Sequence, residues 1–264
     1  NYLYLADRGR IYGDVRLYDD QGTGIHFYTN REDTIADQEM TVELSRIDLK
    51  QFKKVLPYLP DVEGWLGGSL HYVDSEGQMM LSADMNLDNF VYEKSPLGNW
   101  AMSGAYLPGD NNAHHVDGFI TYNNQEIIYM NGVYQADETG QENITGELEL
   151  QHFPLRVINP FIPEKMVAFT GDIDGTLSMT GSPMKPVLNG GLQLDSVLMI
   201  MPDMSVGFRF DNKQVKMQDS KMVFDKFNIY TRGETPFVVN GAVDFSDMEK
   251  MMVDLRMKTS NYEL

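Results

Sequence analysis

Apolar and polar residues alternate with a period of two along most of the chain. Successive side chains of a β-strand point to opposite faces of a sheet, so this alternation predicts strands with one apolar and one polar face. Stretches rich in Gly, Pro, Asp, Asn and Ser separate the strands about every ten residues, as turns do between antiparallel strands. The clearest alternating segments are residues 176–179, 188–194, 204–210 and 253–257. The pattern predicts an all-β protein, a long antiparallel meander of roughly fifteen or more strands.

Two short segments depart from this alternation. Residues 49–56 carry apolar side chains at helical spacing and are followed by Pro57. Residues 154–159 begin with a proline, which suits the first turn of a helix, and are followed by Pro160. A proline that follows a helix prevents the helix from continuing. Each segment therefore predicts one or two turns of amphipathic α-helix or 3₁₀-helix.

An internal repeat follows these two segments. Residues 57–60 and 160–163 both place an aromatic and an aliphatic residue between two prolines. Residues 64–88 then align without a gap on residues 171–195, and seven of the 25 positions are identical. The identical pairs are Gly64/Gly171, Gly68/Gly175, Leu70/Leu177, Ser75/Ser182, Leu81/Leu188, Leu87/Leu194 and Asp88/Asp195. The repeat predicts two tandem units of about 105 residues, at 44–146 and 147–264, after the tail of a preceding β repeat at 1–43. We expect one continuous β structure that is a segment of a longer chain.

The second unit carries a motif that resembles a known family. The motif consists of Asn159, Pro160, Phe161, Ile162 and Pro163, followed by Gly171, Gly175, Leu177, Met179, Gly181, Pro186, Gly190, Leu192 and Leu194. It resembles the AsmA-like superfamily, in particular the C-terminal repeats of the TamB family, the translocation and assembly module of Gram-negative envelopes. Residues 227–233 and 237–243 resemble that family's closing strands. The first unit departs from the motif, with Asp74 and Met79 where the second has Gly181 and Pro186. The resemblance covers residues 44–264.

The resemblance implies a fold and a function. The fold would be a long β-sheet folded over into an open β-groove, a "β-taco", with an apolar concave side. The longer chain would be anchored in the inner membrane by an N-terminal helix outside this sequence, and would span the periplasm. Its partner would be an Omp85-type outer-membrane barrel, TamA-like or BamA-like. The implied roles are phospholipid transport between inner and outer membranes and assembly of outer-membrane proteins.

One-faced strands allow two arrangements of their apolar side chains. A second sheet about 10 Å away can cover them, or they can stay open as a strip, which usually marks a binding surface. An acyl chain on such a strip gains about 0.8 kcal/mol for each buried methylene. The predicted groove-lining residues are Leu70, Leu81, Met85, Leu87, Met102, Ile120 and Leu148 in the first unit, and Leu177, Met179, Leu188, Leu192, Leu194, Val206, Phe208, Phe210, Phe224, Ile229, Val243, Leu255 and Met257 in the second. The alternative, a closed core made by the same residues, stays open.

Charge and cysteine content exclude several classes of function. The net charge is −18, and binding of phosphate groups requires clustered Lys and Arg, so nucleic acid is not an expected partner. A basic patch for anionic lipid surfaces is disfavoured for the same reason. The chain has no cysteine, which excludes disulfides, thiolate metal sites and cysteine nucleophiles. The 18 methionines fit either an adaptable lining or ordinary core filling.

Two pairs of residues could suggest a metal site. His114 and His115 are adjacent, but neighbouring side chains of a strand point to opposite faces and cannot easily share one ion. Asp172 and Asp174 resemble the start of a calcium-binding loop, but the downstream ligands are missing. We therefore expect no metal and no cofactor.

The sequence contains no Gly-x-Ser-x-Gly nucleophile elbow, His-Glu-x-x-His motif, phosphate-cradling loop or dinucleotide-binding fingerprint. The acid pairs Asp137/Glu138 and Glu147/Glu149 could hydrolyse glycosides only if two carboxylates faced each other across a cleft. We expect a non-enzymatic protein with no catalytic residues. The leading hypothesis is an envelope-biogenesis protein that presents an elongated apolar groove to phospholipid acyl chains. A β-sandwich carbohydrate-binding module is the second hypothesis, and a glycosidase is the third.

Overall fold

The fold is almost entirely antiparallel β-sheet in the computed structural model of this protein. The structure describes residues 1–5, 10–29, 37–136, 139–162, 166–231, 233, 235–247 and 250–260. The chain divides into two compact units, unit 1 at Asn1–Glu126 and unit 2 at Ile127–Leu264. The all-β class, the long antiparallel meander and the two short helices that the sequence predicted are confirmed.

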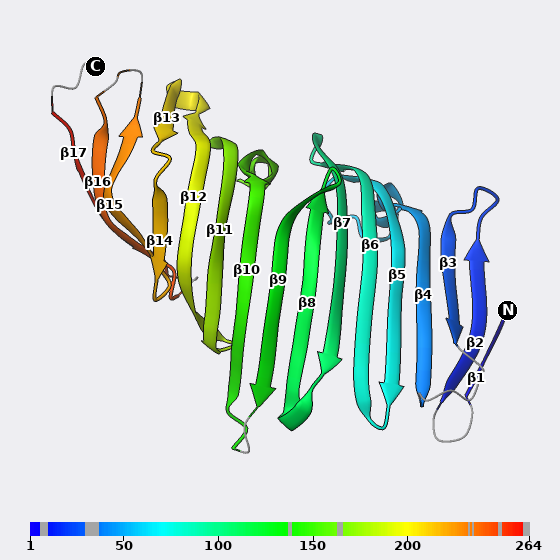
Figure 1. The fold of residues 1–264 in the computed structure, drawn as a ribbon. Helices are drawn as coiled ribbons and strands as arrows, with labels where there is room; N and C mark the ends of the chain where they lie inside the picture. Colours follow the sequence, from blue (N-terminus) through cyan, green and yellow to red (C-terminus); the bar gives the residue numbers. More distant parts are fainter. Residues whose placement is uncertain are drawn as a thin grey trace. The chain divides into compact units, whose positions relative to one another are not determined.

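Unit 1 is a simple meander, in which each strand from β1 to β8 pairs with the next strand in the chain (Figure 1). Its strands are β1 (Tyr2–Leu5), β2 (Ile11–Tyr18), β3 (Gly24–Thr29), β4 (Gln38–Asp48), β5 (Val62–Ser75), β6 (Gln78–Tyr92), β7 (Ser95–Pro108) and β8 (Ala113–Tyr122). Its helices are η2 (Leu49–Gln51), α1 (Phe52–Val55) and η3 (Asp110–Asn112).

Unit 2 is a meander with one split strand position. The 17-residue strand β12 pairs with two short strands, with β13 near its C-terminal end and with β14 nearer its middle. Both short strands then pair with β15. The strands are β9 (Gln125–Ala136, which starts just before the unit), β10 (Glu142–Pro154), β11 (Ala168–Ser182), β12 (Lys185–Met201), β13 (Val206–Phe210), β14 (Gln214–Gln218), β15 (Lys221–Tyr230), β16 (Phe237–Asp244) and β17 (Met252–Lys258). The helices are η4 (Leu155–Phe161) and η6 (Pro202–Met204).

The two predicted helices differ in detail from the expectation. The first consists of the 3₁₀ turn η2 and the single α-helical turn α1, and the side chain of Asp48 caps it by accepting a hydrogen bond from Lys50 N. The second, η4, is a 3₁₀-helix that contains Pro160 and ends at Phe161, so the expectation that it would end before Pro160 was wrong. A proline near the end of a short helix costs little, because few backbone bonds remain to be lost there.

The two sequence repeats share irregularities of the backbone. The register of β5 and β6 shifts between Glu63 and Trp65, and the register of β11 and β12 shifts at the equivalent place, between Thr170 and Asp172. The repeat-related Gly68 and Gly175 have φ angles of 133° and 148°. Bulges increase local twist and are placed by specific residues. The division into units at Glu126 concerns packing, so the repeat limits of 44–146 and 147–264 remain a prediction.

Within each unit, the described strands form a sheet with little covering it. The substantial contacts between elements join strands that pair with each other, or a strand and the helix that precedes it. One small core occurs in unit 2, where Val215, Phe227 and Val239 are buried together. Most apolar side chains therefore lie on a face of the sheet and not in a buried core.

A buried serine fixes the position of the turn between β14 and β15. Ser220 is 3% exposed, and its Oγ accepts a hydrogen bond from Leu188 N at 3.0 Å and donates one to Pro186 O at 3.2 Å. Its backbone N also donates to Leu188 O at 2.8 Å. The Ser220 side chain thus provides hydrogen-bond partners for backbone groups of β12 that lie beyond the end of β14.

We expect Ser220→Ala to lower the stability of unit 2 by about 1–3 kcal/mol, because a buried backbone N–H and a carbonyl lose their partner. The matched control is Ser178→Ala, whose exposed Oγ donates to Asn189 O at 3.1 Å and whose loss should cost about 0.5 kcal/mol or less. Thermal unfolding followed by circular dichroism measures both. Equal effects of the two substitutions would contradict this role of Ser220.

Candidate functional site: the apolar face of each unit

Directly paired residues of neighbouring strands carry their side chains on the same face of a sheet, so the register identifies the apolar face of unit 1. Met85 of β6 lies opposite Met102 of β7, which lies opposite Ile120 of β8. Leu87 and Leu81 alternate with Met85 along β6. Leu70 of β5 lies opposite Ala83, which belongs to the same alternating set. Six of the seven residues predicted for the first repeat lie within unit 1, and all six therefore share one face.

The apolar face of unit 1 extends beyond the predicted residues, onto β2, β3 and β4. A row of directly opposite residues crosses seven strands. It consists of Leu17, Ile25, Leu44, Gly68, Met85, Met102 and Ile120. Val15, Phe27, Val42 and Leu70 form a second, parallel row. Residues before 44 were missed as lining because they were assigned to the tail of another repeat, although residues 39–44 show the same period-two alternation.

Unit 2 presents a corresponding apolar face. One row of directly opposite residues crosses eight strands and consists of Met130, Leu148, Leu177, Gly190, Met217, Met222, Val243 and Val253. The remaining predicted residues belong to this face by alternation along the strands or by direct pairing, such as Met179 with Leu188 and Phe210 with Ile229. Leu148 was predicted for the first unit, but it lies on β10 in unit 2. The register thus brings all the residues predicted for the second unit onto one face.

The predicted lining is accessible to solvent. None of the 20 residues is buried; Leu70, Met102 and Met257 are exposed by 40%, 47% and 59%, and the others are half-buried. Among the described residues of the whole chain, nine hydrophobic side chains are buried. Contiguous exposed apolar surface beyond a few hundred Å² is unusual in a monomeric protein and usually marks an interaction site. The face therefore has the properties of a binding surface.

Part of the lining of unit 2 belongs to a local core. Leu194, Phe210, Phe224, Ile229 and Leu255 pack against the buried cluster of Val215, Phe227 and Val239. The rings of Phe224 and Phe227 meet edge to face, with centroids 5.5 Å apart. These five residues fit the closed-core alternative in part, because their side chains pack against the buried cluster as well as lining the apolar face. Leu148, Leu177, Met179 and Leu188 lie outside that cluster.

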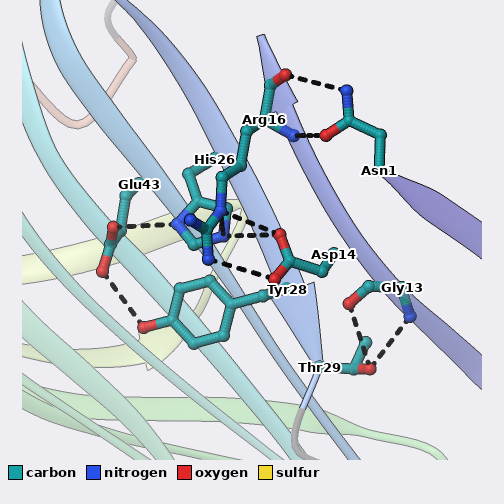
Figure 2. A network of polar contacts seen from close by, with 8 residues as sticks. All are labelled: Asn1, Gly13, Asp14, Arg16, His26, Tyr28, Thr29 and Glu43. Atoms are coloured by element: carbon teal, nitrogen blue, oxygen red, sulfur yellow. Dashed lines mark hydrogen bonds and ion pairs between the residues drawn. The ribbon is translucent and has the colours of Figure 1, made fainter. Parts of the chain in front are cut away.

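The opposite face of unit 1 is polar and carries a network of hydrogen bonds and ion pairs over β2, β3 and β4 (Figure 2). The side chain of His26 lies between two carboxylates, with Nε2 at 3.1 Å from Asp14 Oδ1 and Nδ1 at 3.4 Å from Glu43 Oε2. Arg16 Nε donates to Asp14 Oδ1 at 3.0 Å, and Tyr28 Oη donates to Glu43 Oε1 at 3.0 Å. Burial raises the pKa of Tyr28, and its hydrogen bond to Glu43 acts in the same direction. This network had no signal in the sequence, because its members come from three strands.

The pKa of Asp14 is lowered from its ordinary value of 3.8, mainly by the hydrogen bond from Arg16 and also by His26, while desolvation opposes both. A carboxylate that is more acidic in the folded than in the unfolded chain stabilises the fold above its unfolded pKa. That contribution is lost as the pH falls through the lowered folded pKa. Asp14 therefore makes unit 1 more stable at neutral pH than well below pH 3.8.

We expect Asp14→Asn to lower the melting temperature at neutral pH, and the difference from the wild type to vanish well below pH 3.8. Asp20→Asn, in the adjacent turn, is the control and should change little at either pH. Melting curves over a pH series measure the effect. A difference that persists undiminished at the acidic end would rule out the carboxylate as its source.

The two candidate histidines lie on opposite faces of the sheet, whereas Asp172 and Asp174 alternate on one face of β11. His114 and His115 lie opposite Pro108 and Leu107, consecutive residues of β7, so their side chains occupy opposite faces. Asp174 accepts hydrogen bonds from the backbone N of His152 and contacts its ring. In the parts of the chain that the structure describes, no three His, Asp or Glu side chains gather as metal ligands would.

Of the candidate acids, the described pair Glu147 and Glu149 do not face each other across a cleft. Glu147 and Glu149 alternate on one face of β10, side by side along the strand and not across a cleft. Asp137 and Glu138 lie outside the described residues. The retaining and inverting mechanisms of glycoside hydrolysis both need two carboxylates that flank the scissile bond. The geometry of Glu147 and Glu149 gives no support to that chemistry.

A row of tyrosines lies on the polar face at β1 and β2. The ring centroids of Tyr4 and Tyr12 are 5.7 Å apart with nearly parallel planes, and those of Tyr2 and Tyr4 are 6.1 Å apart. Tyr2 lies directly opposite Asp14, so the row adjoins the polar network. Tyr2 and Tyr4 are 37% and 47% exposed. The arrangement combines aromatic surface with hydrogen-bonding groups.

No helix within the described part of the chain combines the length and the apolar character that crossing a bilayer requires. Comparison of the chain with family models, with curated proteins and with solved structures finds no match in any of the three. The resemblance to the TamB family therefore stays a prediction that depends on the residues quoted for it.

Proposed function

We propose that this chain is a non-enzymatic protein of the Gram-negative cell envelope that binds phospholipid acyl chains along the apolar faces of its two units. Its place would be the periplasm, as part of a chain anchored in the inner membrane. Its role would be the movement of phospholipids between the inner and outer membranes, the assembly of outer-membrane proteins, or both, together with an Omp85-type barrel. The observation that carries the proposal is that, apart from the buried Met217, the apolar rows stay partly or fully exposed across the strands of each unit.

The chemistry of the face suits a long, flexible, apolar ligand. Each buried methylene of an acyl chain contributes about 0.8 kcal/mol without a requirement for directional bonds. The rows repeat from strand to strand, so a ligand finds similar surroundings at each step. Methionines such as Met85, Met102 and Met179 adapt to differently shaped partners because they are unbranched and polarizable.

A second candidate function is carbohydrate binding, and the tyrosine row of Tyr2, Tyr4 and Tyr12 favours it. Flat aromatic surfaces accept the apolar faces of sugar rings, and the adjoining Asp14 and Arg16 offer an acceptor and donors for hydroxyl groups. This site would use the polar face of unit 1, whereas acyl chains would use the apolar face. The two functions therefore predict different ligands on different surfaces.

Lipid extraction tests the leading proposal. The protein is purified from a Gram-negative host without detergent, extracted with organic solvent, and the extract is analysed by mass spectrometry. The lipid-free protein is then incubated with phosphatidylethanolamine vesicles, reisolated and extracted again. We expect phospholipid in a fixed ratio to protein in both extracts. Lipid-free protein that takes up no phospholipid from vesicles, together with specific binding on a glycan array, would replace the proposal with the carbohydrate-binding alternative.

A further inference from the structure

A hollow of about 420 Å³ lies in unit 1, between β2 and β4, where β3 ends. Beyond the last residue of β3, Thr29, the side chain of Gln38 reaches from β4 to β2. Its Oε1 accepts a hydrogen bond from Ile11 N at 2.7 Å, and its Nε2 donates one to Ile11 O at 2.9 Å. Ligand pockets commonly measure about 300–1,000 Å³, so the hollow has room for a small polar group.

The hollow lies at one end of the apolar face of unit 1. Along β5, Leu70, Tyr72 and Asp74 alternate onto that face, and the last two line the hollow. On β4, Met40 lies opposite Tyr72 and Gln38 lies opposite Asp74, and both also line the hollow. The row of apolar residues that contains Leu70 is therefore followed, toward the end of the strands, by a polar pocket on the same face.

Two carboxylates and one guanidinium line the hollow, and only one of the carboxylates is paired. Arg10 Nη2 donates to Asp37 Oδ1 at 3.1 Å, and Glu76 N donates to Asp37 Oδ2 at 2.9 Å. Asp74 forms no ion pair with any described residue, and its Oδ1 is buried without a hydrogen-bond partner. Burial of an unpaired carboxylate is costly, so a cation in the hollow would stabilise Asp74.

Arg10 can bind an anion in the hollow while it holds Asp37. Its guanidinium carries several N–H donors in a planar fork that matches the oxygens of a phosphate. Asp37 and Tyr12 engage part of these donors, and the side chain of Arg10 is 28% exposed. The hollow therefore offers one group for a cation and one for a phosphate.

We infer that this hollow binds the head group of phosphatidylethanolamine, with the ammonium on Asp74, the phosphate on Arg10 and an acyl chain on the row that contains Leu70. The inference rests on the proposed function, because it needs acyl chains on the apolar face. A primary ammonium supplies both the charge and the hydrogen-bond donors that Asp74 lacks. Phosphatidylglycerol carries the same phosphate but no cation, so this end of unit 1 should select phosphatidylethanolamine.

Photo-crosslinking beside the hollow tests the selectivity. A photoreactive benzoyl-phenylalanine replaces Leu70, or Leu192 in unit 2, which contributes no residue to the hollow. The lipid-free protein is illuminated with vesicles that hold equal amounts of phosphatidylethanolamine and phosphatidylglycerol with the same acyl chains. We expect the ratio of ethanolamine to glycerol lipid among the adducts to be at least about fivefold higher at Leu70 than at Leu192. The Leu192 ratio corrects for general repulsion of an anionic lipid by the acidic chain.

Asp74→Asn keeps the shape of the side chain and removes its charge. We expect it to bring the lipid ratio at Leu70 down to that at Leu192, while adducts of both lipids still form. The matched control is Asp84→Asn, which makes the same change at an exposed residue on the polar face, opposite Ser103, and should keep the high ratio. Circular dichroism checks that both variants are folded.

Competition with soluble head groups tests both contacts without a substitution. Phosphoethanolamine in excess should lower the lipid ratio at Leu70 more strongly than ethanolamine does, because only phosphoethanolamine also carries a group for Arg10. Equal competition by the two compounds would overturn the role of Arg10.

The outcomes separate this inference from the proposed function. Equal lipid ratios at Leu70 and Leu192 in the otherwise unchanged protein, or a high ratio that survives Asp74→Asn, would overturn the head-group site and leave acyl binding in place. A lack of adducts with either lipid at both positions would overturn the head-group site and the proposed function together.

Discussion

Gly175→Ala is expected to lower the melting temperature of unit 2 by roughly 5–15 °C. Gly175 has a φ angle of 148°, a conformation that residues with a Cβ rarely adopt. A Cβ built there would lie 2.2 Å from Gly191 O and 3.0 Å from Leu192 Cα, on the neighbouring strand. Both are backbone atoms, so β11 and β12 would have to separate.

Two further glycines control this prediction. Gly207→Ala should be tolerated, because its Cβ would meet only Leu198 Cδ1 at 3.5 Å, an ordinary contact. Gly68→Ala, at the repeat-related position of unit 1, should be as damaging as Gly175→Ala, since its Cβ would lie 2.1 Å from Asp84 O. Differential scanning calorimetry measures all three. Equal shifts of the melting temperature by Gly175→Ala and Gly207→Ala would contradict the close approach of the β11 and β12 backbones at Gly175.

Leu177→Asp is expected to reduce phospholipid uptake from vesicles at least about tenfold while leaving the fold intact. Leu177 lies on the apolar face of β11, between Leu148 and Gly190 of the neighbouring strands. It is half-buried, so a carboxylate there can still reach water in the free protein. When an acyl chain covers it, the charge must be desolvated, and that costs several kcal/mol.

The matched control is Thr180→Asp, which makes the same change of charge on the same strand. Thr180 is exposed and lies on the opposite face, between Thr145 and Val187. It should leave phospholipid uptake unchanged, as measured by mass spectrometry of reisolated protein. Circular dichroism of both variants confirms that they are folded. Equal loss of uptake in the two variants would mean that net charge, and not the apolar face, governs binding.

The apolar face was predictable from sequence because it follows from local rules. Side-chain direction alternates along a strand whatever the strand pairs with, so Leu177 and Met179 of β11, and Leu188 and Leu192 of β12, could be assigned to the apolar side of their own strand before any register was known. The short helices were predictable for a similar reason, since proline and helical spacing are local signals. The extension onto β2–β4 was missed through the assignment of residues 1–43 to a different repeat, although residues 39–44 alternate clearly.

Features that depend on long-range pairing could not be predicted from the sequence. Two short strands, β13 and β14, pair with different parts of β12, and this arrangement depends on where each short segment finds its partner along the long strand. The buried cluster of Val215, Phe227 and Val239 likewise requires three strands to meet. The network around His26 joins residues up to 29 positions apart, from Asp14 to Glu43, which show no motif when separated in the sequence.

Photo-crosslinking at adjacent positions on the two faces tests the binding of acyl chains most directly. A photoreactive benzoyl-phenylalanine replaces Leu192 or Phe208 on the apolar face, or the neighbouring Gln193 or Arg209 on the polar face, and each protein is illuminated with phosphatidylethanolamine vesicles. We predict phospholipid adducts at Leu192 and Phe208 and few or none at Gln193 and Arg209. Equal labelling of both faces, or labelling confined to the polar face, would contradict an acyl-binding apolar face.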